Sequence, residues 1–472
     1  MKSTNAKADD LARTLGDKLI LRGGEGYDAA RTSRIFHDRH PDRFPAAIIR
    51  VSSEQDIVDG VRYANAQGIK VGILAGGHSF PVWGVRDDAL LLDLGGFKEM
   101  MLDVDTGIVS VTPAVQGGNE LYAYLRPYGR FFAGGGCPSV GVGGFILQGG
   151  MGWNFRGWGY AAEGLVAIDV VTADGELIRA DETQNADMLW AARGSGPGFF
   201  GAVTRFYIQT RPIPKALRYT RQVYPIDCFS KVFVWLGEKQ TAISDKVHLL
   251  AFSVIPATPV PGHNGGFVLD VLGLAFCDTV EEATAVLAPL NECPYLGEAL
   301  LLQDCFPTSM EEQYAFIDSI HPSGFRYRVD SAWVDGSYSD IADASHALVF
   351  DRPVDEPGHT FFQFALPRSG PDMAMSLRTK VMVGAYIIYP HAEDDQRYRD
   401  WSLSAMKALE PLTYGQYWGD SDQQHREVRC LTDDAWSRLK VIRQQRDPEG
   451  VFVGYLAKEK GFDNLNEWES QG

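Results

Sequence analysis

The sequence is poor in cysteine and lacks any long run of apolar residues. Its six cysteines form no Cys-x-x-Cys pair and no metal-like spacing in 472 residues, so no metal site is expected, and all but Cys137 are expected to be buried free thiols. No apolar run approaches the roughly 18–20 residues that a membrane-spanning helix needs. The first ten residues carry no apolar segment of the kind found in a secretory signal, which predicts a cytoplasmic protein.

Positive charge is also scarce. The chain has 44 Lys and Arg residues against 61 Asp and Glu residues, a formal net charge of −17. A general binder of nucleic acids or of anionic membranes needs a basic face, so neither kind of partner is expected. With 45% hydrophobic and 11% aromatic residues the chain can bury large cores. Its length predicts two or three structural units, in a monomer or a homodimer.

Glycine, by contrast, is concentrated in one stretch. Residues 131–153 read F-F-A-G-G-G-C-P-S-V-G-V-G-G-F-I-L-Q-G-G-M-G-W. Glycine loses the most conformational freedom on folding, so this density indicates that another group approaches the backbone closely or that residues adopt positive φ. Free backbone N–H groups in such a loop form good anion cradles. The thiol of Cys137 lies in the middle, before Pro138, which fixes the direction of the chain.

A second glycine loop, Ala75-Gly76-Gly77-His78-Ser79-Phe80, follows the apolar run at 71–74. One loop presents a histidine and the other presents Cys137. Both side chains are nucleophilic enough to form a covalent bond to a cofactor. The two loops together therefore predict a large phosphate-bearing cofactor held between them.

The pair of motifs G-G-H-S and G-G-G-C-P-S-V-G-V-G-G resembles the berberine-bridge-enzyme-like branch of the vanillyl-alcohol-oxidase superfamily, which consists of FAD-linked oxidases. The resemblance extends to residues 167–175, 189–204 and 447–452. It implies a PCMH-type FAD-binding domain and a flavin attached twice, through His78 to its 8α carbon and through Cys137 to C6. It also implies the other cofactor-binding residues: Ala75, Gly76, Gly77, Ser79, Phe80, Pro138, Ser139, Val140, Gly141, Gly143, Gly144 and Val203. The pyrophosphate is expected on the N–H groups of Gly76, Gly77, Ser79 and the Gly143–Gly144 region.

Two other readings of the glycine loops are disfavoured. The segment 141–144 lacks the G-x-G-x-x-G spacing between a strand and a helix, and no acidic partner follows, so nicotinamide binding is not expected. Residues 77–81 almost spell G-x-S-x-G, but Pro81 replaces the last glycine and cannot adopt the strained turn of a nucleophilic serine. The histidines of His37-Asp38-Arg39-His40 are expected at the surface and not at a metal.

The pattern of apolar residues predicts an α+β fold. A strand at 45–51, a helix that starts at 52–55 and ends at Gly68, and a strand at 71–74 place the His78 loop at the C-terminal end of a strand. Further short strands and helices are expected at 90–94, 108–111, 119–128 and 166–171. Longer antiparallel strands are expected at 248–255, 266–276, 361–366 and 381–389, with covering helices at 279–290 and 393–409. A further helix at 434–444 is expected in the segment that returns to the first domain. We expect an FAD-binding domain at 1–212, a substrate-binding domain at 213–420 and a return to the first domain at 421–472.

An oxidase also needs a base near the substrate O–H group. The string Tyr414-Gly415-Gln416-Tyr417-Trp418-Gly419-Asp420 resembles the family motif Y-x-N-Y-x-D, in which the first tyrosine is the usual base. The match points to Tyr414, although Gln416 replaces the asparagine and the aspartate is displaced by one position. Aromatic packing at a domain seam is the alternative reading. The other candidates for an acid or base are Tyr417, Tyr386 and Tyr389. The candidates for substrate-lining residues are Tyr386, Trp418 and Gln363.

Val140 lies where the family carries its oxygen gatekeeper, and a valine there resembles the oxidases more than the dehydrogenases. The resemblance implies two-electron oxidation of an alcohol-type small molecule, a secondary metabolite or a xenobiotic, with hydride transfer to flavin N5 and reduction of O2 to H2O2. Two alternatives stay open. One is a carbohydrate oxidase that forms lactones, and the other is a flavin-binding protein without turnover.

Overall fold

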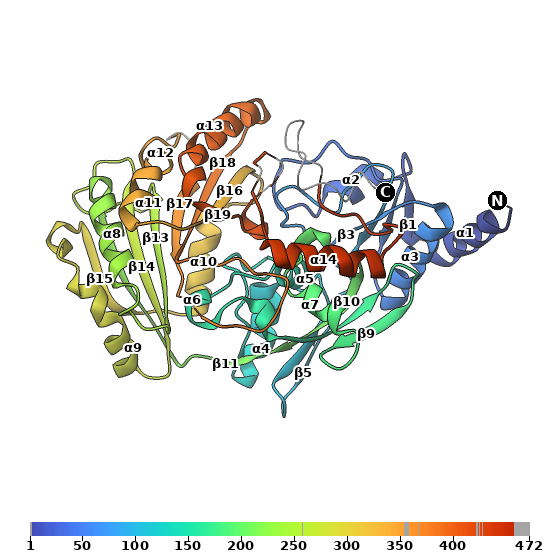
Figure 1. Cartoon of the computed structure of the whole chain (residues 1–472), viewed down its shortest axis with the longest axis horizontal. Coiled ribbons are helices and arrows are strands. Elements are labelled where there is room, and N and C mark those ends of the chain that lie inside the picture. The colour runs from blue at the N-terminus through green and yellow to red at the C-terminus, as the bar shows by residue number, and fades with distance from the viewer. Residues whose placement is uncertain are drawn as a thin grey trace.

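The computed structural model describes residues 2–256, 258–353, 358–366, 368–421, 423, 425–426 and 428–456. The chain forms two parts around three main sheets (Figure 1). Sheets that contain residues 19–209 lie on one side, and a single eight-stranded sheet that contains residues 216–415 lies on the other. None of the helices in these ranges combines the length and the hydropathy needed to cross a bilayer.

The first sheet carries the His78 loop. Its strands lie in the order β1 (Leu19–Leu21), β2 (Ala47–Arg50), β4 (Leu90–Asp93) and β3 (Val71–Leu74), and β2 and β3 run parallel to β4. Between β2 and β3 lies α3 (Glu54–Gln67). Ser53 and Asp56 form a capping box at its start, and Gly68 ends it with φ 68°, a conformation that glycine adopts without strain. The predicted order of strand, helix, strand and glycine loop is confirmed.

The second sheet is antiparallel, with strands β5 (Met100–Asp103), β6 (Ile108–Val111), β10 (Ala202–Gln209), β8 (Leu165–Val171) and β9 (Leu177–Asp181) in that order. Helix α7 (Ala186–Ala192) is held against α14 (Asp433–Arg446) by two hydrogen bonds from Arg446 to Asp187, of 2.8 and 2.7 Å. The expected helix at 119–128 is irregular, because a wide turn over Gly117–Tyr122 precedes α4 (Ala123–Leu125). The other short elements of this half are α1 (Lys2–Leu15), α2 (Tyr27–Thr32), β7 (Arg130–Phe131), α5 (Val142–Leu147), α6 (Phe155–Trp158) and β11 (Arg211–Pro212).

The third sheet is antiparallel throughout. Its order is β15 (Leu301–Pro307), β12 (Ala216–Pro225), β14 (Val268–Cys277), β13 (Val247–Val254), β17 (Gly358–Phe364), β18 (Val381–Tyr389), β16 (Arg326–Val334) and β19 (Thr413–Gly415). The four strands predicted here are confirmed within a few residues. The strands β12, β15, β16 and β19 were not predicted.

Alternation along these strands gives the third sheet two different faces. Leu249 and Ala251 of β13 pack in a core with helix residues such as Phe233, whereas Leu250 and Phe252 belong to the core shared with the first part, as the period of two in a strand requires. The α+β class and the helix-covered antiparallel sheet are therefore confirmed. The helices of this half are α8 (Phe229–Lys239), α9 (Val280–Leu287), α10 (Met310–Ile320), α11 (Tyr338–Ala344), α12 (His346–Phe350) and α13 (Asp395–Lys407).

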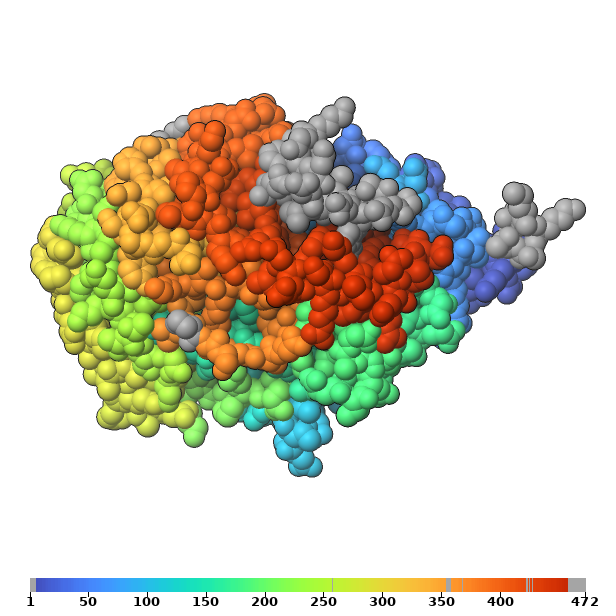
Figure 2. Space-filling model, in the orientation of Figure 1, coloured from blue at the N-terminus to red at the C-terminus, as the bar shows by residue number. Residues whose placement is uncertain are grey.

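The end of the described chain returns to the first sheet. Helix α14 runs past the first part, where the red segment in Figure 2 lies against the green and blue surface. Phe452 then pairs in parallel with Val71 at the free edge of β3, through bonds of 2.7 Å (Val71 N–H to Val451 O) and 3.0 Å (Val453 N–H to Val71 O). The limits of the FAD-binding and substrate-binding domains at residues 212 and 420 stay a proposal. Residues 457–472 of the predicted return segment lie outside the described residues.

A buried arginine holds the two parts together. Arg156 of α6 is 1% exposed, and its guanidinium donates to the backbone carbonyls of Gln240, Ser244 and Ile243, the last at 2.7 Å. These carbonyls belong to the segment between α8 and β13. Because the charge is buried, its loss leaves several buried carbonyl groups without a donor.

We expect Arg156→Met to lower the free energy of unfolding by about 3 kcal/mol, since it unpairs buried acceptors at the junction of the two parts. Urea denaturation followed by circular dichroism measures this change. Arg126→Met is the matched control, because the Arg126 side chain is 61% exposed in its ion pair with Glu311 and such pairs contribute roughly 0–1 kcal/mol. Equal losses in the two variants would contradict the assigned role of Arg156.

Candidate active site

The two glycine loops touch, backbone against backbone. A Cβ atom on Gly76 would lie 2.5 Å from the Gly141 nitrogen, and one on Gly141 would lie 2.7 Å from the Gly76 Cα. Gly77 has φ 79°, and a side chain there would strike the Arg34 carbonyl. The close approach predicted from the density of glycine is thus present. It brings the His78 loop and the Cys137 loop to one place.

The side chains of the two loops are joined by a hydrogen bond. His78 Nε2 lies 3.0 Å from Ser139 Oγ, and the Phe36 ring stacks on the imidazole at 4.3 Å. Burial, with smaller contributions from the nearby His37 and His321, lowers the pKa of His78 to about 3, so the imidazole is neutral at pH 7. Burial also raises the pKa of the free thiol Cys137 to about 12. Both groups are therefore uncharged at neutral pH.

Both loops line a cavity of about 360 Å³, within the usual size of a ligand site. Two predicted cofactor residues do not line it. Pro138 packs against Gly118, and Ser139 instead orients His78. The other predicted cofactor residues all line the cavity: Ala75, Gly76, Gly77, His78, Ser79, Phe80, Cys137, Val140, Gly141, Gly143, Gly144 and Val203.

The backbone of the His78 loop fits a phosphate-bearing group. The N–H groups of Gly76, Gly77 and Ser79 donate to no acceptor among the described residues, which leaves a row of donors at the cavity wall. Gly144 lies in the first turn of α5, where helix N–H groups have no intrahelical partner. Gly143 differs from the prediction, because its N–H donates to the Pro113 carbonyl at 2.9 Å and is not free. The N–H groups of Gly76, Gly77, Ser79 and Gly144 are thus available as donors to an anion.

The third sheet supplies the opposite wall of the cavity. Strands β13, β17 and β18 pair so that Phe252 faces Phe361 across one pair and His359 faces Tyr386 across the other. These side chains line the cavity together with Leu250, Gln363 and His248. The sequence-predicted residues Gln363 and Tyr386 are therefore placed at the cavity.

A tyrosine and an aspartate form the strongest polar contact of this wall. The Tyr386 hydroxyl donates to Asp420 Oδ1 at 2.5 Å, and its ring stacks on His359 at 4.9 Å. Burial raises the pKa of Asp420 to about 6, against a smaller lowering by the Tyr386 hydrogen bond. Burial also raises the pKa of Tyr386, and the Asp420 charge adds to this effect. At pH 7 the Asp420 carboxylate is therefore mostly ionised, and Tyr386 keeps its proton and donates it in the hydrogen bond.

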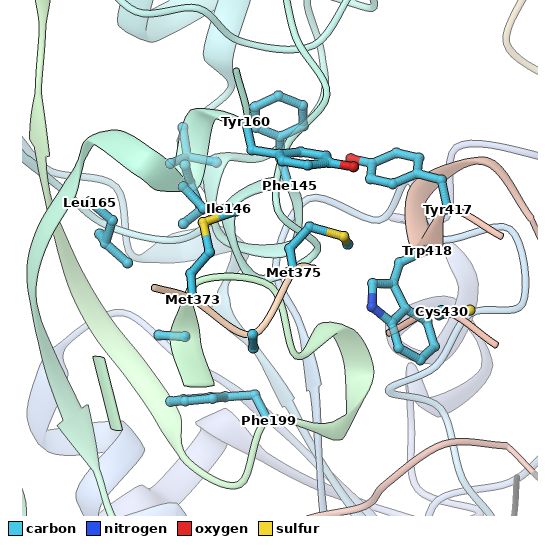
Figure 3. Close-up of a cluster of buried hydrophobic side chains, with 14 of the residues drawn as sticks. Phe145, Ile146, Tyr160, Leu165, Phe199, Met373, Met375, Tyr417, Trp418 and Cys430 are labelled. Atoms are coloured by element: carbon cyan, nitrogen blue, oxygen red, sulfur yellow. The ribbon is translucent and has the colours of Figure 1, made fainter. Parts of the chain in front are cut away.

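The residues of the predicted base motif are separated by the structure. Tyr417 lines the cavity and accepts the Met151 N–H at 2.9 Å, and Figure 3 shows its hydroxyl turned toward that of Tyr160. Tyr414 does not line the cavity, since its ring lies 4.3 Å from the Arg429 guanidinium. Trp418 is buried outside the lining, stacked on Tyr455 at 4.8 Å. Aromatic packing, the alternative reading of the motif, fits Tyr414 and Trp418.

Several cavity residues were not singled out from the sequence. His248 and His359 lie on strands more than a hundred residues apart, and His321 follows α10, with its ring 4.9 Å from that of Tyr386. Asp420 was seen only as a displaced motif residue. The alternation His359-x-Phe361-x-Gln363 was a readable signal, because it places three side chains on one face of a strand.

Comparison with known proteins adds the family. Residues 45–181 match the model of the FAD binding domain. The FAD-linked oxidoreductase janO of Penicillium janthinellum is 34% identical over 438 residues, which cover 92% of this chain and 95% of that protein. The solved structures that share the fold include two oxidases.

They are 6-hydroxy-D-nicotine oxidase of Arthrobacter nicotinovorans (TM-score 0.80, 21% identity, 93% of this chain and 97% of that one) and xylooligosaccharide oxidase of Myceliophthora thermophila (TM-score 0.78, 21% identity, 96% and 100%). The glycine loops, the matched FAD domain and the relative that spans the chain agree with one another. The chain therefore belongs to the berberine-bridge-enzyme-like FAD-linked oxidoreductases.

Proposed function

We propose that this enzyme is an oxidase of alcohol-type small molecules whose FAD is bound covalently to both His78 and Cys137. The observation that carries the proposal is the meeting, in one cavity, of these two nucleophiles with the Tyr386–Asp420 pair. FAD would supply the two-electron acceptor, taking a hydride from the substrate carbon at N5 and returning the electrons to O2 as H2O2.

The hydrogen bonding of His78 supports attachment through one particular nitrogen. Ser139 Oγ lies 3.0 Å from Nε2, and in the tautomer whose Nε2–H donates to the serine oxygen, Nδ1 carries the lone pair for bond formation. The low pKa of His78 keeps the ring neutral, and a neutral imidazole is the nucleophilic form. Cys137 is a free thiol at the same cavity, so the chain offers one nitrogen and one sulfur to the cofactor.

We expect the intact mass of the denatured protein to exceed the sequence mass by one FAD, because covalent bonds survive unfolding. Acid precipitation should leave a yellow pellet. Cys137→Ala and His78→Ala should each retain flavin through the remaining bond, and the double variant should release it. Cys277→Ala is the control, since this buried thiol lies in the helix-covered core of the third sheet. A sequence-only mass and a colourless pellet from the unmodified protein would refute covalent attachment.

The Tyr386–Asp420 pair supports a proton relay. Because the Tyr386 hydroxyl donates to Asp420, its oxygen can accept a hydrogen bond from a substrate hydroxyl. As the substrate C–H bond breaks, the substrate O–H proton moves to the Tyr386 oxygen and the Tyr386 proton moves to Asp420 Oδ1. The carbonyl product forms and the protein gains one proton on the carboxylate. Tyr417 is the further acid–base candidate at the cavity, and Tyr414 is not proposed because it is not among the lining residues.

The position of Val140 supports O2 as the electron acceptor. Val140 is half-buried and lines the cavity beside Cys137, to whose carbonyl its N–H donates at 3.2 Å. A short branched side chain leaves more room there than a longer one would. The proposed partners are thus one small-molecule substrate and O2.

We expect the rate of flavin reduction by a reactive alcohol to rise with pH through about 6, because Asp420 accepts the proton only when it is ionised. Below that pH the rate should fall about tenfold per unit. Asp420→Asn should abolish the fall in rate below pH 6. Tyr386→Phe should lower the rate of flavin reduction about 10²–10⁴-fold. Anaerobic stopped-flow measurements over pH 4.5–8.5 test this. Tyr414→Phe serves as the control with an unchanged profile, and the relay is wrong if Tyr414→Phe loses the rate while Tyr386→Phe keeps it.

A further inference from the structure

The lining of the cavity is almost free of charge. No lysine, arginine or glutamate is found among the described side chains that line it, and its one carboxylate, Asp420, is bound to Tyr386. Burial lowers the pKa values of His248 and His321 to about 4, so these rings add no positive charge at pH 7. At the sheet wall, away from the N–H groups of the glycine loops, a charged ligand would lose its hydration and find no opposite charge, which is costly.

Three polar side chains of the sheet wall are nevertheless short of hydrogen bonds. His248 Nδ1, His359 Nδ1 and Gln363 Nε2 are buried atoms without a partner in the described part of the chain. The three residues are only 5%, 1% and 5% exposed. Leaving such a group unpaired costs about 1–3 kcal/mol, so a ligand atom that completes one of these bonds gains a corresponding advantage over one that does not.

The surface between these polar groups is apolar. Gln363 of β17 pairs with Leu250 of β13, and two residues farther along each strand Phe361 pairs with Phe252. Gly384 of β18 leaves room for the Phe361 ring, which would strike any side chain at that position. The wall therefore offers aromatic and aliphatic faces with a few isolated polar atoms, a composition that suits flat rings.

Building on the proposed oxidase function, we propose that the substrate is a neutral, largely hydrophobic ring compound and that Gln363 selects it by donating a hydrogen bond to an oxygen remote from the reacting carbinol. Tyr386 of β18 accepts a hydrogen bond from the carbinol hydroxyl, and Gln363 of the neighbouring strand β17 donates one to the second oxygen. An oligosaccharide fits poorly, because most of its hydroxyl groups would meet Leu250, Phe252 and Phe361 and lose their hydrogen bonds to water. An organic carboxylate fits poorly for want of a cation.

Binding to the holoenzyme tests this with four probes that share or lack the relevant groups. They are 6-methoxy-2-naphthalenemethanol, its 6-ethyl isostere, 6-(hydroxymethyl)-2-naphthoate and xylobiose. The dissociation constants come from changes in the flavin absorption spectrum under anaerobic conditions. We expect the methoxy compound to bind about tenfold more tightly than the ethyl isostere, which lacks the acceptor, and both to bind more tightly than the naphthoate and xylobiose.

The variant Gln363→Leu should weaken binding of the methoxy compound about tenfold and leave the ethyl compound unchanged, which removes the discrimination. Gln209→Leu, a substitution of the same kind at an exposed position of β10, should keep it. The comparison of the two naphthyl compounds in the unmodified enzyme needs no variant and is independent of any loss of folding in Gln363→Leu.

Equal affinity for the methoxy and ethyl compounds, no binding of either, or tighter binding of xylobiose or the naphthoate would each overturn the proposal. Peroxide release is measured separately with the same probes. If the affinities follow the expected order but no peroxide is released, the oxidase function is wrong and the binding preference still holds. If peroxide is released but the order of affinities is reversed, the oxidase function holds and the binding preference is wrong.

Discussion

The contact between Gly76 and Gly141 is the constraint on which the site depends. Each loop leaves its own strand or helix, and neither would place its nucleophile at the cavity if the backbones stood farther apart. Any Cβ atom at the contact would meet the opposite backbone within 2.7 Å, so only glycine keeps the loops closed. Closure also brings Ser139 within 3.0 Å of His78 and leaves the N–H groups of the loop free for an anion.

One face of the third sheet packs against helices, and the other face lines the cavity. Leu249 and Ala251 pack against the helices that cover the sheet, whereas Leu250 and Phe252, their neighbours along β13, line the cavity. Because alternate residues point to opposite faces, the cavity wall can change without disturbing the helix-packed core.

The parts of the site with local signals were predictable, and the parts set by tertiary register were not. His78 and Cys137 each lie in a glycine loop that stands out in sequence. By contrast, the strand that ends at Gly415 pairs with β16, and this pairing directs Tyr417 and Asp420 to the cavity and leaves Tyr414 beside Arg429. The seven residues of the motif alone do not indicate which of their side chains face the cavity. Likewise, Gly143 loses its free N–H to Pro113, a residue thirty positions away.

The pairing of Phe452 with Val71 has a consequence for biosynthesis. Strand β3 emerges early from the ribosome, but the segment that covers its edge is translated only after the whole third sheet. Until then β3 presents an open edge, which is a template for wrong pairing with other chains. The first sheet can therefore be completed at the β3 edge only after translation has passed residue 453, and until then a chain still on the ribosome exposes that edge.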